Sequence, residues 1–246
     1  HYQKKVENRI MASIELPTGT ITFLLTDLEE STRHFEQAPE RAQQALIHHD
    51  AIIERDAAAF NGIVVKPRGE GDSRFIVFEQ ATTAVAAAVR IQQDLYAETW
   101  ETPWPLRVRI ALHTGEANLR QGDYYGTVVN RCARLRAIGH GGQTLLSEAT
   151  WALVQDVLPP RVFAQDEGEH HLKGLSRPEH VYQLIIPDLP REFAPLRSLG
   201  IIPNNLPLQL TEFIGRKEDI QKTRRCLQDC RLLTIVGPGG IGKSRM

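Results

Sequence analysis

The chain has 246 residues, of which 41% are hydrophobic and 24% are charged, and its formal net charge is −1. This length holds one large domain, or one domain with part of a second, and the near-neutral charge gives no electrostatic case for binding nucleic acid or an anionic membrane. No apolar run approaches the roughly 20 residues of a membrane helix, and residues 1–10 lack the apolar core of a signal peptide. We therefore expect a cytoplasmic protein, with residues 1–17 as a leader or upstream segment.

Hydrophobic periodicity divides most of the chain into alternating strands and helices. In chain order, the pattern predicts a strand at 20–26, one long helix at 31–60, strands at 63–66 and 74–78 joined by a hairpin connection, a helix at 81–99, a strand at 106–113, a helix after Gly126, a strand at 144–146, a helix from Ser147, and strands around Val162, Leu172 and 181–185. The opening order β-α-β-β-α-β is that of the split βαβ, ferredoxin-like arrangement. We expect an α+β domain with an antiparallel-rich sheet and flanking helices.

The pattern dissolves after residue 186. Five prolines between residues 187 and 207 disfavour helix and central strand, so residues 187–210 are interpreted as a proline-rich linker. Residues 211–246 then contain a helical stretch, a strand at 231–236 and a match to the phosphate-binding loop G-x-x-x-x-G-K-[ST]. The residues of that loop expected to contact phosphates are Gly237, Gly242, Lys243 and Ser244. This part is interpreted as the truncated start of an α/β P-loop NTPase domain.

Cysteine and histidine give only weak metal-binding signals. Cys226 and Cys230 have i, i+4 spacing on an expected helix, but no nearby Cys or His completes a zinc set. The adjacent pairs His48–His49 and His170–His171 point apart on a helix or a strand. Solvated or singly packed histidines are therefore the simpler interpretation.

Asn130 and Arg134 stand at i, i+4 spacing just after a glycine-marked turn. That spacing puts the amide and the guanidinium on one face of a helix. A planar cation beside a neutral donor and acceptor suits a site at which negative charge grows on a phosphate.

Two aspartates are candidate metal ligands. Asp27 follows an apolar strand, and Asp72 stands at the tip of the expected hairpin connection. Each is a common turn residue, but if the two strands lie side by side the carboxylates converge. Two carboxylates together with substrate phosphates bind paired Mg²⁺ or Mn²⁺. Their occurrence together with Asn130 and Arg134 favours the metal interpretation.

These residues, in this order, resemble the catalytic domain of the class III nucleotidyl cyclases over residues 18–186. The matching segments are Phe23–Thr32, Gly71–Asp72, His113–Glu116, Asp123–Arg134 and His170–Leu175. The resemblance implies that Asp27 and Asp72 hold two Mg²⁺ or Mn²⁺ ions per site, and that Asn130 orients the ribose. It further implies that Arg134 stabilises the α-phosphate in the transition state, and that Lys173, on a late strand, holds the terminal phosphates. The implied reaction is attack of the ribose 3′-hydroxyl on the α-phosphate of a nucleoside triphosphate, in a signalling protein.

Two positions depart from the family pattern. The family usually has glycine three residues after the first metal aspartate, but this chain has Glu30, a carboxylate that repels phosphate unless it points away or joins the metal shell. Adenine-selective members have lysine four residues before the hairpin aspartate, where this chain has Arg68. Arg68 can still donate to adenine N1 while Asp123 accepts from the 6-amino group, whereas guanine presents a carbonyl to Asp123. We therefore expect ATP as the substrate and 3′,5′-cyclic AMP with pyrophosphate as the products.

In the family, the metal aspartates of one subunit meet the Asn/Arg helix of the other, so the resemblance implies a homodimer with active sites at the interface.

Residues 204–216 also resemble the entry to the NTPase modules of STAND-type regulators. Two alternatives stay open. One is a degenerate cyclase domain that binds nucleotide and dimerises as a regulatory module. The other is an NTPase switch whose N-terminal domain is only structural.

Overall fold

The computed structural model describes residues 16–65 and 71–198, and in addition residues 219, 221–223, 225, 226, 234 and 236. By internal contacts the chain divides into two compact units, residues 1–202 and 203–246. In the second unit, the described residues 219, 221–223, 225 and 226 are helical. Outside the described residues lie Arg68 and the expected phosphate-binding loop with Gly237, Gly242, Lys243 and Ser244.

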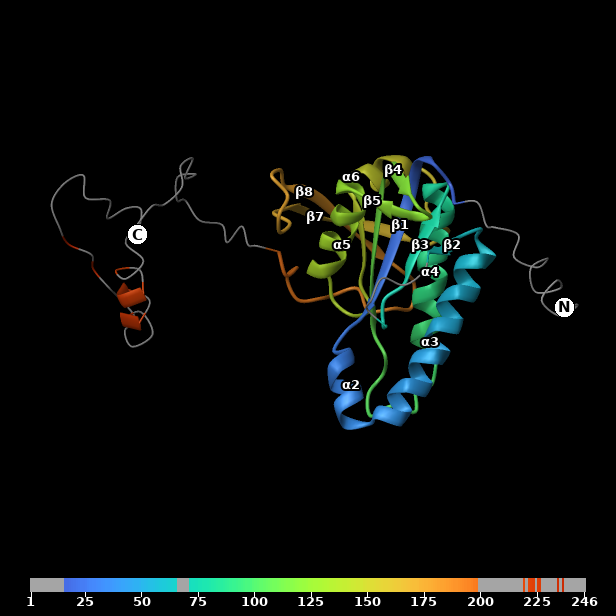
Figure 1. The fold of residues 1–246 in the computed structure, drawn as a ribbon, viewed down its shortest axis with the longest axis horizontal. Helices are drawn as coiled ribbons and strands as arrows, with labels where there is room; N and C mark the ends of the chain where they lie inside the picture. The colour runs from blue at the N-terminus through green and yellow to red at the C-terminus, as the bar shows by residue number, and fades with distance from the viewer. Residues whose placement is uncertain are drawn as a thin grey trace, which may run out of the picture. The chain divides into compact units, whose positions relative to one another are not determined.

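The described part of the first unit is a sheet with helices on both faces (Figure 1). Its elements are β1 (Gly19–Leu28), α2 (Ser31–Gln37), α3 (Pro39–Ala59), β2 (Ile63–Val65), β3 (Phe75–Phe78), α4 (Ala81–Ala97), β4 (Val108–Arg120), β5 (Asp123–Tyr125), α5 (Thr127–Ile138), β6 (Thr144–Ser147), α6 (Glu148–Val154), β7 (Phe163–His170) and β8 (Glu179–Ile185). The strand order is β2-β3-β1-β4-β6-β8-β7, and β5 pairs with β4.

The sheet is mixed, because β4 and β6 are parallel whereas the other paired strands are antiparallel. The four strands at one side, β2-β3-β1-β4, have the order and directions of a split βαβ unit. The connection from β4 to the parallel strand β6 contains α5, as a crossover between parallel strands requires. The expected sheet with flanking helices is thus present, and β6, β8 and β7 extend it beyond the split βαβ core.

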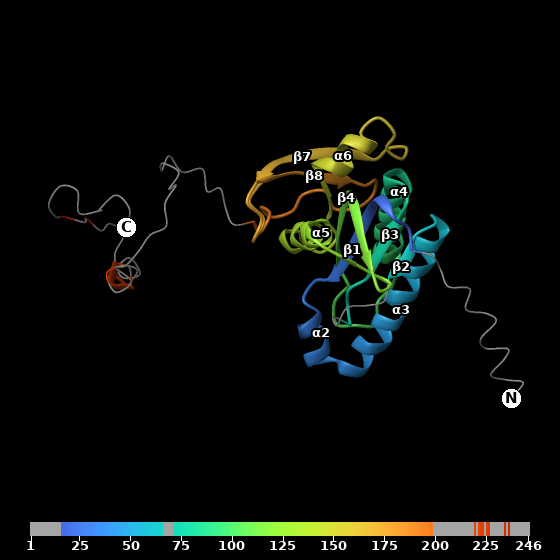
Figure 2. The same ribbon diagram turned by 45° about the horizontal axis from the view of Figure 1, so that its top comes forward.

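Successive side chains of β1 point to opposite faces of the sheet and pack into two separate apolar cores. Leu24 and Leu28 belong to the core between the sheet and helices α3, α4 and α6, whereas Phe23 and Leu25 belong to the core beneath α5. Figure 2 shows the two layers, with α5 on one face of the sheet and α3 and α4 on the other. None of the helices in the described part of the chain combines the length and the apolar composition needed to span a lipid bilayer.

The prediction of one long helix over 31–60 is wrong, because α2 and α3 are separate helices. Between them Ala38 has φ −149° and ψ 68°, which is not helical, and Pro39 is the first residue of α3. Proline lacks an N–H and its ring disfavours helical backbone in the residue before it, so it is tolerated in the first turn of a helix and ends the preceding one.

Two strand predictions also need correction. The predicted strand around Leu172 is absent: β7 ends at His170, and Leu172 is buried in the connection to β8. Its apolar character therefore reports packing under α5 rather than pairing in the sheet. The strand predicted at 106–113 extends to Arg120, because β4 pairs with β1 as far as Ala117 and with β5 from Asn118 to Arg120.

We expect Phe23→Ala to lower the free energy of unfolding by about 3–5 kcal/mol. The Phe23 ring is fully buried, stacks on Phe75 at a centroid distance of 5.8 Å and meets Tyr124 edge-on at 5.4 Å, so truncation leaves a cavity. Phe35→Ala is the matched control, since that ring is 36% exposed on α2, and it should change stability by less than about 1 kcal/mol. Urea denaturation measures both, and equal losses would contradict the assignment of Phe23 to a packed core.

Candidate active site

Asp27 lies at the end of the central strand and is buried, with 7% of the residue exposed. Arg109 is its cross-strand partner in β4, and its guanidinium forms an ion pair with the Asp27 carboxylate. Arg136 of α5 approaches from the other side, with Nη2 3.7 Å from Asp27 Oδ1 and Nη1 donating to the Thr26 carbonyl at 3.0 Å. Two guanidinium groups from two different elements therefore neutralise this carboxylate in a desolvated position.

Asp72 lies at the same end of the neighbouring strand. The β1–β3 pairing runs to Leu25 opposite Phe75, and Thr26 continues it, because its N–H donates to the Arg74 carbonyl at 2.9 Å. Only Ser73 separates Arg74 from Asp72, so Asp72 lies near the end of β1 at which Asp27 stands. The two candidate metal ligands thus come from adjacent strand ends, and Asp72 is half-buried in the turn before β3.

The chemistry of this pair fits a hard divalent cation. Within the described residues, no group of three or more His, Cys, Asp and Glu side chains could hold a metal ion by itself. Mg²⁺ is commonly held by one or two carboxylates, with substrate phosphates and water completing its coordination. Asp27 and Asp72 fit that mode, provided that the guanidinium groups beside Asp27 give way to the cation.

Asn130 and Arg134 lie one turn apart on the solvent side of α5. The helix begins directly after Gly126, whose φ of 109° is a backbone region that favours glycine. Its opposite side packs on the sheet through Val129, Cys132, Leu135 and Ile138, whereas Asn130 and Arg134 are exposed. The amide and the guanidinium are therefore presented together outside the body of the domain.

A single chain does not bring Arg134 to Asp27. Arg136 points from α5 toward Asp27, and Arg134 precedes it by two residues, which is a rotation of about 200° around the helix axis. Arg134 therefore points to nearly the opposite side of α5. In one chain the carboxylate end of β1 and the Asn130–Arg134 face of α5 are separate surfaces.

The two remaining candidates lie on the α5 side of the sheet. Asp123 starts β5, and its Oδ1 accepts from the Tyr124 N–H at 2.8 Å. Lys173 is exposed in the connection between β7 and β8, so its expected place on a strand is wrong. Its neighbour Leu172 packs into the core beneath α5, so the backbone of Lys173 lies on the α5 side of the sheet.

The backbone conformation of Glu30 explains why glycine suits the position three residues after Asp27. Its backbone is left-handed, with φ 55° and ψ 30°, a conformation that costs a non-glycine residue about 1–2 kcal/mol. Its carboxylate accepts from Arg33 Nη1 at 3.0 Å, and both side chains are more than half exposed. The extra negative charge thus points outward and is partly neutralised by the first turn of α2.

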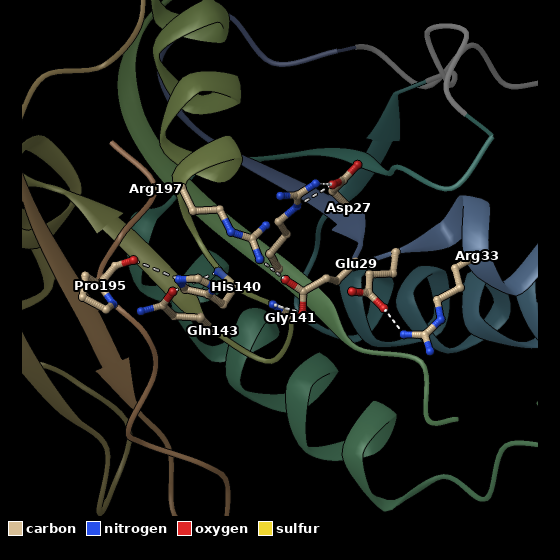
Figure 3. A network of polar contacts seen from close by, with 10 residues as sticks. Asp27, Glu29, Arg33, His140, Gly141, Gln143, Pro195 and Arg197 are labelled. Atoms are coloured by element: carbon tan, nitrogen blue, oxygen red, sulfur yellow. Dashed lines mark hydrogen bonds and ion pairs between the residues drawn. The ribbon is translucent and has the colours of Figure 1, made fainter. Parts of the chain in front are cut away.

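Sequence reasoning missed four residues that surround the end of β1: Arg109, Arg136, Glu29 and Arg197. Figure 3 shows Arg197 reaching Glu29 next to Asp27, and Glu29 also accepts from the Gly141 N–H. Arg109 lies in a strand that the sequence pattern predicts, but its partner Asp27 lies 82 residues away in the chain. Arg136 and Arg197 carry no comparable signal in the sequence.

Comparison with known proteins places this fold and these residues in a family. The family profile described as adenylate and guanylate cyclase catalytic domain matches residues 15–186. The chain belongs to this family. The matched region spans β1 to β8, and so contains both carboxylates and the exposed face of α5.

Relatives of the cyclase domain occur among bacterial and eukaryotic proteins. An uncharacterized protein of Mycobacterium bovis is 43% identical over 205 residues, which are 83% of this chain and 70% of that protein. An adenylate cyclase of Podospora anserina is 28% identical over 72% of this chain, and the match covers 11% of that protein. Among solved structures, a monomeric adenylate cyclase of Trypanosoma brucei superposes with a TM-score of 0.67 at 27% identity, over 76% of this chain and 98% of that one. A guanylate cyclase domain of Catenaria anguillulae shares the fold, with a TM-score of 0.60 at 17% identity over 69% of this chain and 97% of that one.

A buried polar network joins strands β1, β4 and β6 to helix α6 in the cyclase domain. Thr22 bonds Thr114 at 2.9 Å, Thr114 bonds Thr150 at 3.1 Å, and His113 Nδ1 bonds Ser147 Oγ at 2.7 Å. Burial, reinforced by the nearby Arg131 charge, lowers the pKa of His113 from 6.5 to about 4. The imidazole is therefore neutral in the folded protein near pH 7.

This pKa makes stability depend on pH. The unfolded chain protonates His113 near pH 6.5 and the folded chain only near pH 4, so the free energy of unfolding falls by about 3 kcal/mol as the pH drops through that window. In His113→Asn this contribution is absent, since the amide keeps a hydrogen bond to Ser147 but does not titrate. Denaturation curves between pH 7.5 and 4.5 measure the difference. Equal losses in both proteins would show that His113 is not buried neutral.

Proposed function

We propose that this cyclase domain converts ATP to 3′,5′-cyclic AMP and pyrophosphate. The observation that carries the proposal is the retention of two carboxylates on adjacent strand ends together with the exposed Asn130–Arg134 pair on α5. The named adenylate cyclases of Podospora anserina and Trypanosoma brucei, at 28% and 27% identity, support the same reaction.

In this proposal the chain's own residues bind, orient and neutralise the substrate. Divalent cations held by Asp27 and Asp72 would supply Lewis-acid polarisation of the reacting oxygens. The ribose 3′-hydroxyl releases its proton to solvent, its oxygen forms a bond to the α-phosphorus, and the bond from that phosphorus to the bridging oxygen breaks, so that pyrophosphate leaves with the electron pair. Asn130 orients the ribose, and Arg134 contacts charge that develops on the α-phosphate only in the transition state. Lys173 neutralises the terminal phosphates.

Arg109 gains a role from its position. In the structure its guanidinium is paired with the Asp27 carboxylate. When Asp27 holds a cation, this guanidinium loses its partner and becomes available to bind a phosphate oxygen of the substrate. The same arginine then neutralises the carboxylate in the free protein and the triphosphate in the complex.

The proposed active unit is a homodimer with two shared sites. Arg134 points away from Asp27 of its own chain, since Arg136 occupies the side of α5 that faces it. A second copy related by two-fold symmetry can present its Asn130 and Arg134 to the carboxylates of the first, and the reverse contact then forms as well.

Preference for ATP follows from Asp123 in this scheme. A carboxylate accepts from the 6-amino group of adenine but faces the carbonyl of guanine as a second acceptor. Asp123→Asn can also donate, so it should narrow the preference for ATP by about ten-fold.

The direct test is product analysis with ATP and with GTP, each with Mn²⁺ and with Mg²⁺. We expect cyclic AMP as the main product, and we expect Asp72→Asn to lower the turnover roughly 100-fold or more, because it removes a metal carboxylate. More cyclic GMP than cyclic AMP would contradict the base choice. A folded dimer that yields no cyclic product would instead support a nucleotide-binding regulatory module.

Mixing two inactive variants tests the shared site. Arg134→Ala should lower kcat about 100- to 1000-fold, as expected for removal of a transition-state contact. Asp72→Asn alone should lower kcat by a similar factor. An equal mixture should recover about a quarter of wild-type activity, because half of the dimers are mixed and each has one intact site. Light scattering verifies that both variants dimerise. No recovery from dimeric variants would place the complete site within one chain.

A further inference from the structure

Residues 190–198, here called the strap, leave β8 and are fixed to the cyclase domain at several points. The carbonyl of Arg191 accepts from Gln183 Nε2 at 2.8 Å, and the carbonyl of Pro195 contacts His140 Nε2 at 3.2 Å. Arg197 N–H donates to the carbonyl of Ile138 at 2.8 Å, and Ser198 Oγ bonds His170 Nδ1 at 2.9 Å. The strap thus runs over the C-terminal end of α5 with a defined path.

One side chain of the strap reaches the end of β1. Arg197 Nη2 donates to Glu29 Oε1 at 2.6 Å, and the other carboxylate oxygen of Glu29 accepts from the Gly141 N–H at 3.0 Å. Glu29 stands two residues after Asp27, and its own N–H donates to the Arg107 carbonyl at 2.9 Å. Figure 3 shows Arg197, Glu29 and Gly141 meeting beside Asp27. We call these three residues the Glu29 latch.

The loop between α5 and β6 is shaped for this contact. A Cβ on Gly141 would lie 2.5 Å from Glu29 Oε2 and 2.7 Å from the Arg107 Cβ, so any larger residue pushes Glu29 away. Glu29 is 24% exposed and Arg197 is 48% exposed at their side chains. The Glu29 carboxylate is thus held between a backbone amide on one side and a guanidinium on the other.

We infer that Glu29 is a positioning residue for the metal-binding end of β1, and that Arg197 of the strap holds it there. The catalytic part of this inference rests on the proposed cyclase function. With both contacts in place, the end of β1 is bonded to the α5–β6 loop and to the strap. These two contacts hold Asp27 in a fixed position relative to Asp72. Displacement of the strap removes the Arg197 contact to Glu29, loosens the β1 end and lowers turnover.

Kinetics of the full chain test the catalytic part. Residues that orient a metal ligand typically contribute 10- to 100-fold, so Glu29→Ala should lower kcat and raise the metal concentration for half-maximal activity by about that factor. Arg197→Ala should have a smaller effect, about three- to ten-fold, because this pair is partly exposed. Arg197→Lys should restore much of it. The matched control is Arg191→Ala, which removes an exposed side chain of the strap and keeps the backbone contact to Gln183.

The double variant Glu29→Ala with Arg197→Ala should be no worse than Glu29→Ala alone, since both act through one contact. Additive losses would overturn the inference, as would equal losses in Arg191→Ala and Arg197→Ala.

Hydrogen–deuterium exchange gives a readout that needs no activity. Arg197→Ala should speed the exchange of residues 27–30 and of the Gly141 amide by several-fold, whereas Arg191→Ala should not. Unchanged exchange in Arg197→Ala would overturn the latch. A wild-type protein that forms no cyclic nucleotide would refute the proposed function, and exchange would still decide whether the latch positions the β1 end.

Discussion

A carboxylate buried at the end of the central strand needs cationic partners, and the arrangement of three elements follows from that need. An unpaired charge in the place of Asp27 would be strongly destabilising. Arg109 supplies one partner through the β1–β4 register, and Arg136 supplies the other through the rotation of α5 about its axis. The pairing of β1 with β4 and the packing of α5 on the sheet are therefore coupled through one carboxylate.

Helix α5 presents side chains to two different surfaces, because residues that are two positions apart in the sequence lie on nearly opposite sides of a helix. Its buried side packs on the sheet, and Arg136 extends from that side to the end of β1. Asn130 and Arg134 occupy the other side, in solvent. Rotating Arg134 toward Asp27 of its own chain would expose Val129 and Cys132. The proposed association of two copies would bring Arg134 to a carboxylate without distorting the core.

Much of the fold could be predicted because it depends on local periodicity. The strand at 20–26, the hairpin strands at 63–66 and 74–78, and the helix at 81–99 all have counterparts in the structure. The break between α2 and α3 also has a cause in the local sequence, because Pro39 cannot continue the helix that precedes it. The strand expected at Leu172 failed for a different reason. A short apolar segment reports burial, and burial under a helix has the same sequence pattern as burial in a sheet.

By itself, the sequence determined which residue types are available and which of them share a face, as for Asn130 and Arg134 on α5. Only the tertiary structure decided which charges meet. Asp27 pairs with Arg109 across 82 residues, and Glu29 pairs with Arg197 across 168 residues. Strand alternation specifies the side of a sheet but not the neighbouring strand, and an arginine in an irregular segment carries no periodic signal at all. Contacts of this kind arise when the chain closes on itself, because packing of the two cores sets the register and path that bring distant side chains together.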